Sequence, residues 1–136
     1  MHVFERPVRF ADVDATGVVF FPTFFAYCSE ALEQLLLLVI RDGYAEVVLQ
    51  RKIGLPTVRI AGDFTSPLRF GDTARIAIQT EHIGTRSFTL RYSVTRASDG
   101  LPVAELRGTV ATIDLLSTRP IHIPEDIRSV LEQHRS

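Results

Sequence analysis

The stretch Phe10-Ala11-Asp12-Val13-Asp14-Ala15-Thr16-Gly17-Val18-Val19-Phe20-Phe21-Pro22 decides how the rest of the chain is interpreted. It places two acids and a glycine between an expected strand and a long apolar helix. A helix start exposes unpaired backbone N–H groups and a partial positive charge, which suit a developing oxyanion. Asp14 precedes this start closely enough to face the same small volume. A carboxylate beside N–H donors indicates a candidate site for acyl transfer.

The same run resembles the strand-to-helix motif of the 4-hydroxybenzoyl-CoA thioesterase family, which has the hotdog fold. That motif reads approximately D-x-D-x-x-G-[IV]-[VI]-[FWY]-[YFH]-[PA], and residues 12–22 match it throughout. The resemblance extends over most of the chain, through Gly54-Leu55-Pro56-Thr57-Val58, Phe64, Gly71-Asp72 and Thr85-Arg86-Ser87-Phe88. It implies an acyl-CoA thioesterase, an enzyme that hydrolyses an acyl-CoA to a free acid and CoA.

The composition limits the class of protein. A chain of 136 residues fits one domain, expected over residues 1–136. The formal net charge of -1 gives no support for broad nucleic-acid or membrane binding. The single cysteine, Cys28, excludes an intrachain disulfide and is compatible with a reducing compartment. The N-terminus lacks the apolar core of a signal peptide, so we expect a cytoplasmic protein.

One long helix and about five strands are expected. Helical apolar spacing begins at Thr23, and Asp42-Gly43 is expected to stop it. Its broad apolar face suits a helix that a sheet wraps around; its members are Phe24, Phe25, Cys28, Ala31, Leu32, Leu35, Leu36, Leu38 and Val39. Alternating patterns predict strands at about 3–10, 58–64, 73–82, 88–94 and 103–114.

The remaining segments complete an α+β domain. The turn signal Ser98-Asp99-Gly100 predicts an antiparallel hairpin of the last two strands. Pro124 opens an expected C-terminal helix, whereas Tyr44 to Lys52 fits either a short helix or an ordered connection. One long helix with mostly antiparallel strands makes an α+β fold. The resemblance implies the hotdog architecture, an antiparallel sheet of about five strands wrapped around one long helix.

Asp14 is the candidate catalytic carboxylate. The resemblance implies that it attacks the thioester carbonyl or activates water, and that the backbone N–H of Phe21 polarises that carbonyl. Gly17 permits a tight backbone approach or an unusual dihedral angle. On the residues alone, Asp14 could instead stabilise a loop or cap the helix, Gly17 could be an ordinary loop glycine, and Phe21 could be a core residue.

Asp12 is the weaker candidate of the two acids, and we expect it to shape the loop. Two acids could also indicate a metal site, but no histidine or cysteine lies nearby in the sequence to complete a ligand set. We therefore expect no metal.

Substrate contacts are expected from the helix and from two other segments. Ser29 stands where the 4-hydroxybenzoyl-specific type of enzyme has an aspartate that reads the phenol, which argues against that specificity. Phe20 and Phe24 could line an aromatic acyl pocket or be core residues at helical spacing. Thr57, in the similar segment 54–58, is a further candidate, and Cys28 is expected to be buried core.

Thr85, Arg86 and Ser87 occupy the place where the family often holds the phosphates of coenzyme A. Arginine and hydroxyl groups suit phosphate oxygens. A solvated strand start explains the same residues equally well.

The hypothesis is an acyl-CoA thioesterase, with benzoyl or another aryl group as a candidate acyl group. No cofactor is expected, because CoA is part of the substrate, and the resemblance implies a homo-oligomer, a dimer or tetramer. Two alternatives stay open: an acyl-carrier-protein thioesterase, and a noncatalytic module that binds acyl-CoA or an acyl-carrier protein. Hotdog hydratases and dehydratases commonly use an Asp-His pair. No histidine follows Asp14 before His82, which argues against these two classes.

Overall fold

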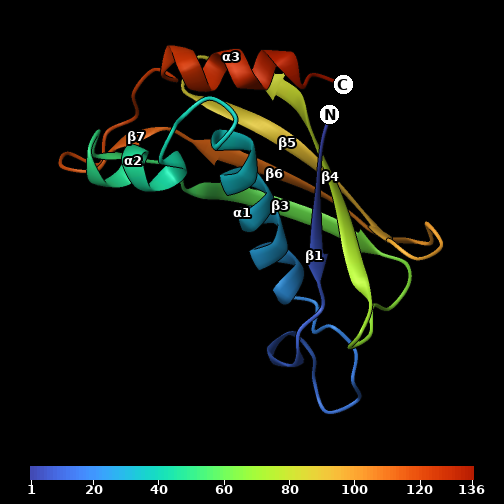
Figure 1. Cartoon of the computed structure of the whole chain (residues 1–136). Coiled ribbons are helices and arrows are strands. Elements are labelled where there is room, and N and C mark those ends of the chain that lie inside the picture. Colours follow the sequence, from blue (N-terminus) through green and yellow to red (C-terminus); the bar gives the residue numbers. More distant parts are fainter.

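The computed structural model describes residues 1–136, and one long helix crosses the concave face of a curved sheet (Figure 1). The strands and helices follow one another in this order: β1 (His2–Pro7), a 3-10 turn (Phe10–Asp12), α1 (Thr23–Leu36), α2 (Gly43–Leu49), β2 (Ile53–Gly54), β3 (Thr57–Phe64), β4 (Thr73–Ile83), β5 (Ser87–Arg96), β6 (Pro102–Ala111), β7 (Ile113–Asp114) and α3 (Glu125–Gln133).

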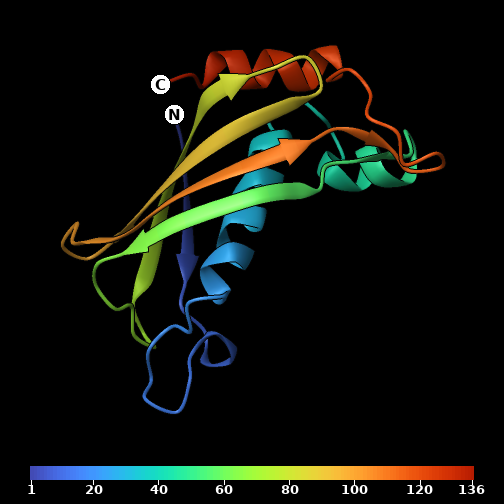
Figure 2. The ribbon, with the colours of Figure 1, turned by 180° about the vertical axis from the view of Figure 1, so that it is seen from behind.

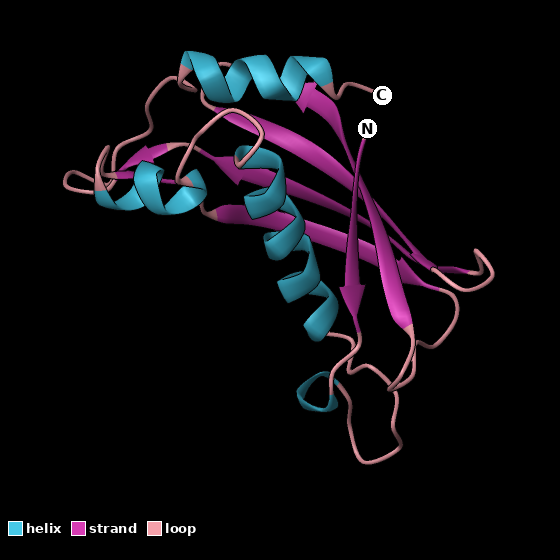
Figure 3. Cartoon of the chain, viewed as in Figure 1, coloured by secondary structure: helices cyan, strands magenta, loops and turns pink.

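The main sheet has five strands in the order β1-β4-β5-β6-β3, and every pair is antiparallel. Seen from behind, the sheet lies in front of α1, with β3 along its lower edge (Figure 2). The colouring by secondary structure shows α2 and α3 near the other end of the sheet from the loop that precedes α1 (Figure 3). No helix has the length and apolar character needed to cross a membrane.

Burial follows the two periodicities in the sequence. One face of α1 is buried at helical spacing, and Phe88, Leu90, Tyr92 and Val94 of β5 all point inward, as their alternation predicts. Twenty-eight buried hydrophobic residues form one cluster between the helix and the sheet. The packing of an apolar helix into a curved sheet is therefore the main source of stability.

The first strand is shorter than expected. β1 ends at Pro7, and the chain then forms the 3-10 turn Phe10–Asp12. The turn forms because the Asp12 carboxylate accepts the Arg9 N–H at 2.8 Å, which closes the backbone on itself. Phe10, the last residue of the predicted strand, is instead in this turn and is 77% exposed.

The long helix also ends earlier than expected. α1 stops at Leu36, six residues before Asp42, because Leu38 and Val39 bond back to carbonyls three residues earlier in tight turns. Both side chains are exposed, so their place in the apolar face was predicted wrongly, whereas Ile40 turns inward. The undecided segment after Gly43 is helical as α2.

A second, two-stranded sheet was not predicted. β7 follows β6 directly and pairs with β2, so the segment predicted as one strand over 103–114 is divided between two sheets. Strands of two residues are too short to show any alternation in the sequence.

A buried carboxylate fastens the loop before α1. Asp12 is 8% exposed and accepts hydrogen bonds from the Tyr27 hydroxyl at 3.0 Å and from the Arg6 guanidinium at 3.1 Å. Its backbone carbonyl also accepts the Phe20 N–H at 3.2 Å. The residue thus connects β1, the loop and α1, which agrees with the expectation that it shapes the loop.

Replacing Asp12 by Asn is expected to lower the free energy of unfolding by about 1.5–3 kcal/mol, because Arg6 keeps only its ion pair with Glu30 and the Tyr27 hydroxyl and Arg9 N–H lose a charged acceptor. Urea denaturation at pH 7 measures this loss. Asp42→Asn, at an exposed carboxylate without a hydrogen-bond partner, is the control and should change stability by less than about 0.5 kcal/mol.

The loss should depend on pH. Burial acts to raise the pKa of Asp12, but hydrogen bonds from Arg9 and Tyr27 and the Arg6 charge outweigh it and lower the pKa. Such a group contributes stability that is complete above the unfolded pKa of about 3.9 and disappears as the pH falls through the folded pKa. The difference between parent and variant should therefore narrow below about pH 4. An equal difference at pH 7 and pH 3 would contradict this account.

Candidate active site

Asp14 lies in a tight turn of the loop that precedes α1, and Figure 1 shows this loop at the lower end of the molecule. The Gly17 N–H donates to the Asp14 carbonyl and the Asp14 N–H donates to the Val18 carbonyl, each at 3.0 Å. Gly17 has φ of +79°, a conformation that costs other residues about 1–2 kcal/mol. The glycine in the motif is thus explained by the turn that presents Asp14.

The Asp14 carboxylate is exposed and ionised at neutral pH. It accepts a hydrogen bond from the Thr16 hydroxyl and a second, of 2.9 Å, from the Thr16 N–H. These bonds lower the pKa of Asp14 below its ordinary value. An ionised carboxylate can act on a carbonyl carbon or take a proton from water.

Apolar side chains surround this carboxylate. A hollow of about 410 Å³ beside Asp14 is lined by Phe10, Val13, Ala15, Gly17 and Phe70. The rings of Phe10 and Phe70 meet edge to face at 5.8 Å between centroids. This aromatic pair was not predicted from the sequence; the place of Phe10 at the start of the motif is the one signal that could have indicated it.

The start of α1 carries a free backbone donor. The Phe20 N–H donates a hydrogen bond to the Asp12 carbonyl, and the Thr23 N–H donates one to the Phe20 carbonyl. Between them, the Phe21 N–H donates no hydrogen bond within the chain, and Pro22 has no N–H. The Phe21 side chain is 56% exposed and meets the ring of Phe64 at 6.1 Å, so this donor lies near the end of β3.

A second cavity, of about 270 Å³, lies between α1 and the sheet. It brings the predicted residues Ser29 and Thr57 together; its lining residues are Phe25, Cys28, Ser29, Leu32, Thr57, Ile60, Tyr92 and Gly108. Burial raises the pKa of Cys28 to about 12, so this residue is an unreactive buried thiol, as expected.

The predicted aromatic residues are not in this cavity. Phe20 is exposed at the loop, and Phe24 is buried in the core against the rings of Tyr27 and Phe64. Of the two explanations for Phe24, the structure supports the core residue.

Thr85, Arg86 and Ser87 lie at the other end of the sheet from Asp14. Their backbone carbonyls accept hydrogen bonds from Ile123, Thr112 and Gly84, respectively. The exposed Arg86 side chain forms no ion pair or hydrogen bond within the chain. Within a single chain, the candidate phosphate-binding residues therefore lie far from the candidate catalytic carboxylate of Asp14.

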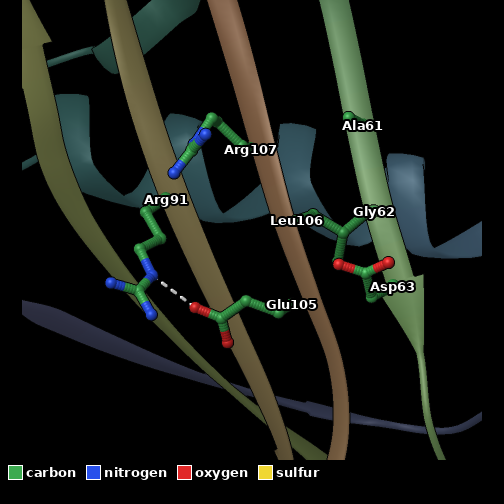
Figure 4. A pocket seen from close by; sticks show the side chains of 7 residues that line it. All are labelled: Ala61, Gly62, Asp63, Arg91, Glu105, Leu106 and Arg107. Atoms are coloured by element: carbon green, nitrogen blue, oxygen red, sulfur yellow. Dashed lines mark hydrogen bonds and ion pairs between the residues drawn. The ribbon is translucent and has the colours of Figure 1, made fainter.

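A third hollow, on the opposite face of the sheet from α1, is polar. Figure 4 shows Arg91 and Arg107 above the strands, with Arg91 bonded to Glu105. Arg107 in turn pairs with Glu81 at 2.6 Å. These charges are largely neutralised by one another, so this face offers little to an acyl group.

The geometry fits a thioester-cleaving enzyme, and the comparisons agree. The sequence model of the thioesterase-like superfamily matches residues 8–131. The chain belongs to this superfamily. It is 31% identical over 135 residues to a 1,4-dihydroxy-2-naphthoyl-CoA hydrolase of Nostoc punctiforme, covering 97% of this chain and 87% of the relative.

Solved structures of the superfamily share the fold. A gentisyl-coenzyme A thioesterase superposes with a TM-score of 0.84 at 26% identity, over 93% of this chain and 99% of its own. A 1,4-dihydroxy-2-naphthoyl-CoA thioesterase from Synechocystis gives 0.86 at 24% identity, over 95% and 93% of the two chains. The predicted hotdog fold and the predicted class, a thioester hydrolase, are confirmed.

Replacing Thr16 by Val removes the hydroxyl that bonds to Asp14 and keeps the backbone N–H. The pKa of Asp14 should rise toward the ordinary value of about 3.9. If the ionised Asp14 carboxylate is the reacting group, the acid limb of kcat/KM should move to higher pH, while kcat/KM at pH 7 stays within about threefold. The measurement is kcat/KM for benzoyl-CoA as a function of pH, over the range in which circular dichroism shows that the protein is folded. An unmoved acid limb would argue against Asp14 as the reacting group.

Proposed function

We propose that this thioester hydrolase acts on aryl-CoA substrates, which it converts to an aromatic carboxylic acid and CoA. The observation that carries the proposal is the exposed, ionised Asp14 in a rigid turn just before the free Phe21 N–H. Support for an aryl group comes from the relatives, which are named for 1,4-dihydroxy-2-naphthoyl-CoA and gentisyl-CoA. The apolar cavity beside Ser29 and Thr57 is the proposed acyl pocket.

The reaction breaks the carbon–sulfur bond of the thioester. Asp14 either attacks the carbonyl carbon, forming an anhydride that water then opens, or takes the proton from an attacking water molecule. In both routes the carbonyl oxygen gains negative charge and accepts the Phe21 N–H at the start of α1. The CoA sulfur leaves as a thiolate, a good leaving group, and is protonated afterwards.

The complete site is proposed to form between two copies of the chain. β3 is an edge strand, and seven of its eight residues are exposed. Phe64 at its end contacts Phe21, whereas Thr57 at its start lies at the acyl cavity and at the same end of the sheet as Ser87.

Two copies of β3 that pair antiparallel about a two-fold axis bring opposite ends of the two chains together. The Phe64 end of one copy then lies beside the Thr57 end of its partner. In this arrangement Asp14 and Phe21 of one copy act on a thioester whose acyl group occupies the other copy's cavity. Arg86, Thr85 and Ser87 of the copy that supplies the cavity are then positioned to hold the CoA phosphates.

Asp14→Asn should abolish hydrolysis and leave binding intact. We expect kcat to fall at least about 100-fold for benzoyl-CoA and 1,4-dihydroxy-2-naphthoyl-CoA, because the amide neither attacks nor accepts a proton. Calorimetry should give the same affinity for the substrate within about threefold. Asp42→Asn is the matched control and should keep full activity. Equal turnover by parent and Asp14→Asn would contradict the proposal, and a parent that binds without turnover would favour a binding module.

Ala61→Asp should separate the two copies. Ala61 is exposed on β3, near the middle of the strand, where like charges would face each other across a two-fold pairing. Light scattering should show the parent at twice the chain mass of 15.2 kDa or a higher even multiple. The variant should associate more weakly, so that single chains are present at protein concentrations at which the parent is still paired. Activity should fall together with the mass.

The control is Ala45→Asp, which adds the same charge on the exposed side of α2. It should change neither mass nor activity. A parent with the mass of one chain at micromolar concentration would contradict the proposed pairing.

A further inference from the structure

Tyr92 is a buried residue whose hydroxyl has no hydrogen-bond partner within the chain. Tyr92 is 3% exposed, and its hydroxyl forms no hydrogen bond within the chain. The chain's other tyrosine hydroxyls are both used: that of Tyr27 donates to Asp12 at 3.0 Å, and that of Tyr44 accepts the Leu55 N–H at 3.0 Å. The hydroxyls of buried tyrosines usually have partners, so an unpaired one needs an explanation.

Its position supplies that explanation. Tyr92 stands in the middle of β5, paired with Ile78 and Leu106, and its side chain lines the cavity between α1 and the sheet. The Tyr92 hydroxyl keeps some accessible surface, unlike the two fully buried unpartnered hydroxyls of the chain, those of Thr80 and Thr112, which do not line this cavity.

A glycine opens the cavity beside the tyrosine ring. Gly108 faces inward on β6, and a Cβ placed there would lie 3.7 Å from the Tyr92 ring carbon Cε2. The absent side chain therefore leaves space along the face or edge of that ring. Phe25, Leu32 and Ile60 supply apolar walls to the same space.

The polar groups of the cavity are neutral. Burial, and then the neighbouring Cys28, raise the pKa of Tyr92, so the phenol keeps its proton and can donate it in a hydrogen bond. Cys28 is likewise protonated, and Ser29 and Thr57 add hydroxyls. A small, largely apolar volume with neutral hydrogen-bonding groups fits a flat ring that carries an oxygen, rather than an unsubstituted ring or a charged group.

We infer that the Tyr92 hydroxyl binds an oxygen substituent on the aromatic ring of the acyl group and selects hydroxylated aryl-CoA over the unsubstituted analogue. This inference rests on the proposed function, because it assigns the acyl group to the cavity. Tyr92 is a specificity residue: it contacts the ring and takes no part in breaking the thioester. Without such an oxygen, the bound ring covers the hydroxyl and leaves it unpaired in the complex, which penalises the wrong substrate.

The test compares Tyr92→Phe with the parent on matched substrates: 1,4-dihydroxy-2-naphthoyl-CoA against 2-naphthoyl-CoA, and 4-hydroxybenzoyl-CoA against benzoyl-CoA. For at least one pair, the ratio of kcat/KM for the hydroxylated over the unsubstituted member should fall about 3- to 15-fold, the range of one neutral hydrogen bond. The unsubstituted member should keep its rate or gain slightly. The melting temperature should not fall, because the lost hydroxyl had no partner.

Two controls separate a specificity role from a structural one. Tyr44→Phe removes a hydroxyl from α2, outside the cavity, and should leave the substrate ratio unchanged. Gly108→Ala narrows the cavity and should weaken both members of the naphthoyl pair together. A Tyr92→Phe variant that lowers both members of each pair equally, or leaves every ratio unchanged, would overturn the inference.

A binding measurement keeps this result separate from the proposed function. Calorimetry of 1,4-dihydroxy-2-naphthoic acid and 2-naphthoic acid needs no turnover, and Tyr92→Phe should weaken only the hydroxylated acid by the same factor. If the parent hydrolyses no aryl-CoA but shows this selective loss, the proposed function fails and the Tyr92 site stands. If hydrolysis occurs and neither assay shows selective loss, the Tyr92 inference alone fails.

Discussion

The buried carboxylate of Asp12 is the constraint on which the site depends. It holds Arg6 of β1, Tyr27 of α1 and the backbone of the connecting loop in one hydrogen-bonded group. The neighbouring Asp14, two residues later, has the opposite environment: it is exposed and bonded only within its own turn. The two acids of the motif therefore differ in role: Asp12 holds the loop in place, whereas the Asp14 carboxylate stays accessible.

The packing of α1 into the sheet forms the core and leaves the proposed acyl cavity. The buried face of the helix fills most of the concave side of the sheet, and the core forms one cluster. Beside Ser29 the filling is incomplete, and the inward position Gly108 of β6, next to the Tyr92 ring, carries no side chain. The absent side chain at Gly108 thus leaves room in the cavity, and Tyr92 lines it with a hydroxyl that has no partner in the chain.

Much of this arrangement could be predicted from the sequence. The helical and alternating patterns indicated α1 and the inward residues of β5, because burial on one face leaves a strong period. The motif around Asp14 indicated the turn and the helix start. The sequence could not show that α1 ends at Leu36, since Leu38 and Val39 continue the apolar pattern while lying in exposed turns.

The cavity was harder to predict than the turn. The alternating pattern of β5 identifies Tyr92 only as an inward residue. The three-dimensional structure is needed to show that its hydroxyl lacks a partner. Gly108 lies in no turn and has no sequence signal of its own. The separation of Asp14 from Arg86 within one chain also depends on strand direction and sheet order, which the local sequence does not encode.

The central claim is that Asp14 of one copy acts on an acyl group held in the cavity of the other. Asp14→Asn and Gly108→Val, which fills the cavity, should each be folded and inactive alone. Co-expressed at equal levels, half of the pairs should be hybrids with one intact site, restoring about one quarter of the parent activity per chain. If the site lay within one chain, no hybrid would hold an intact site, and the absence of any recovery would contradict the account.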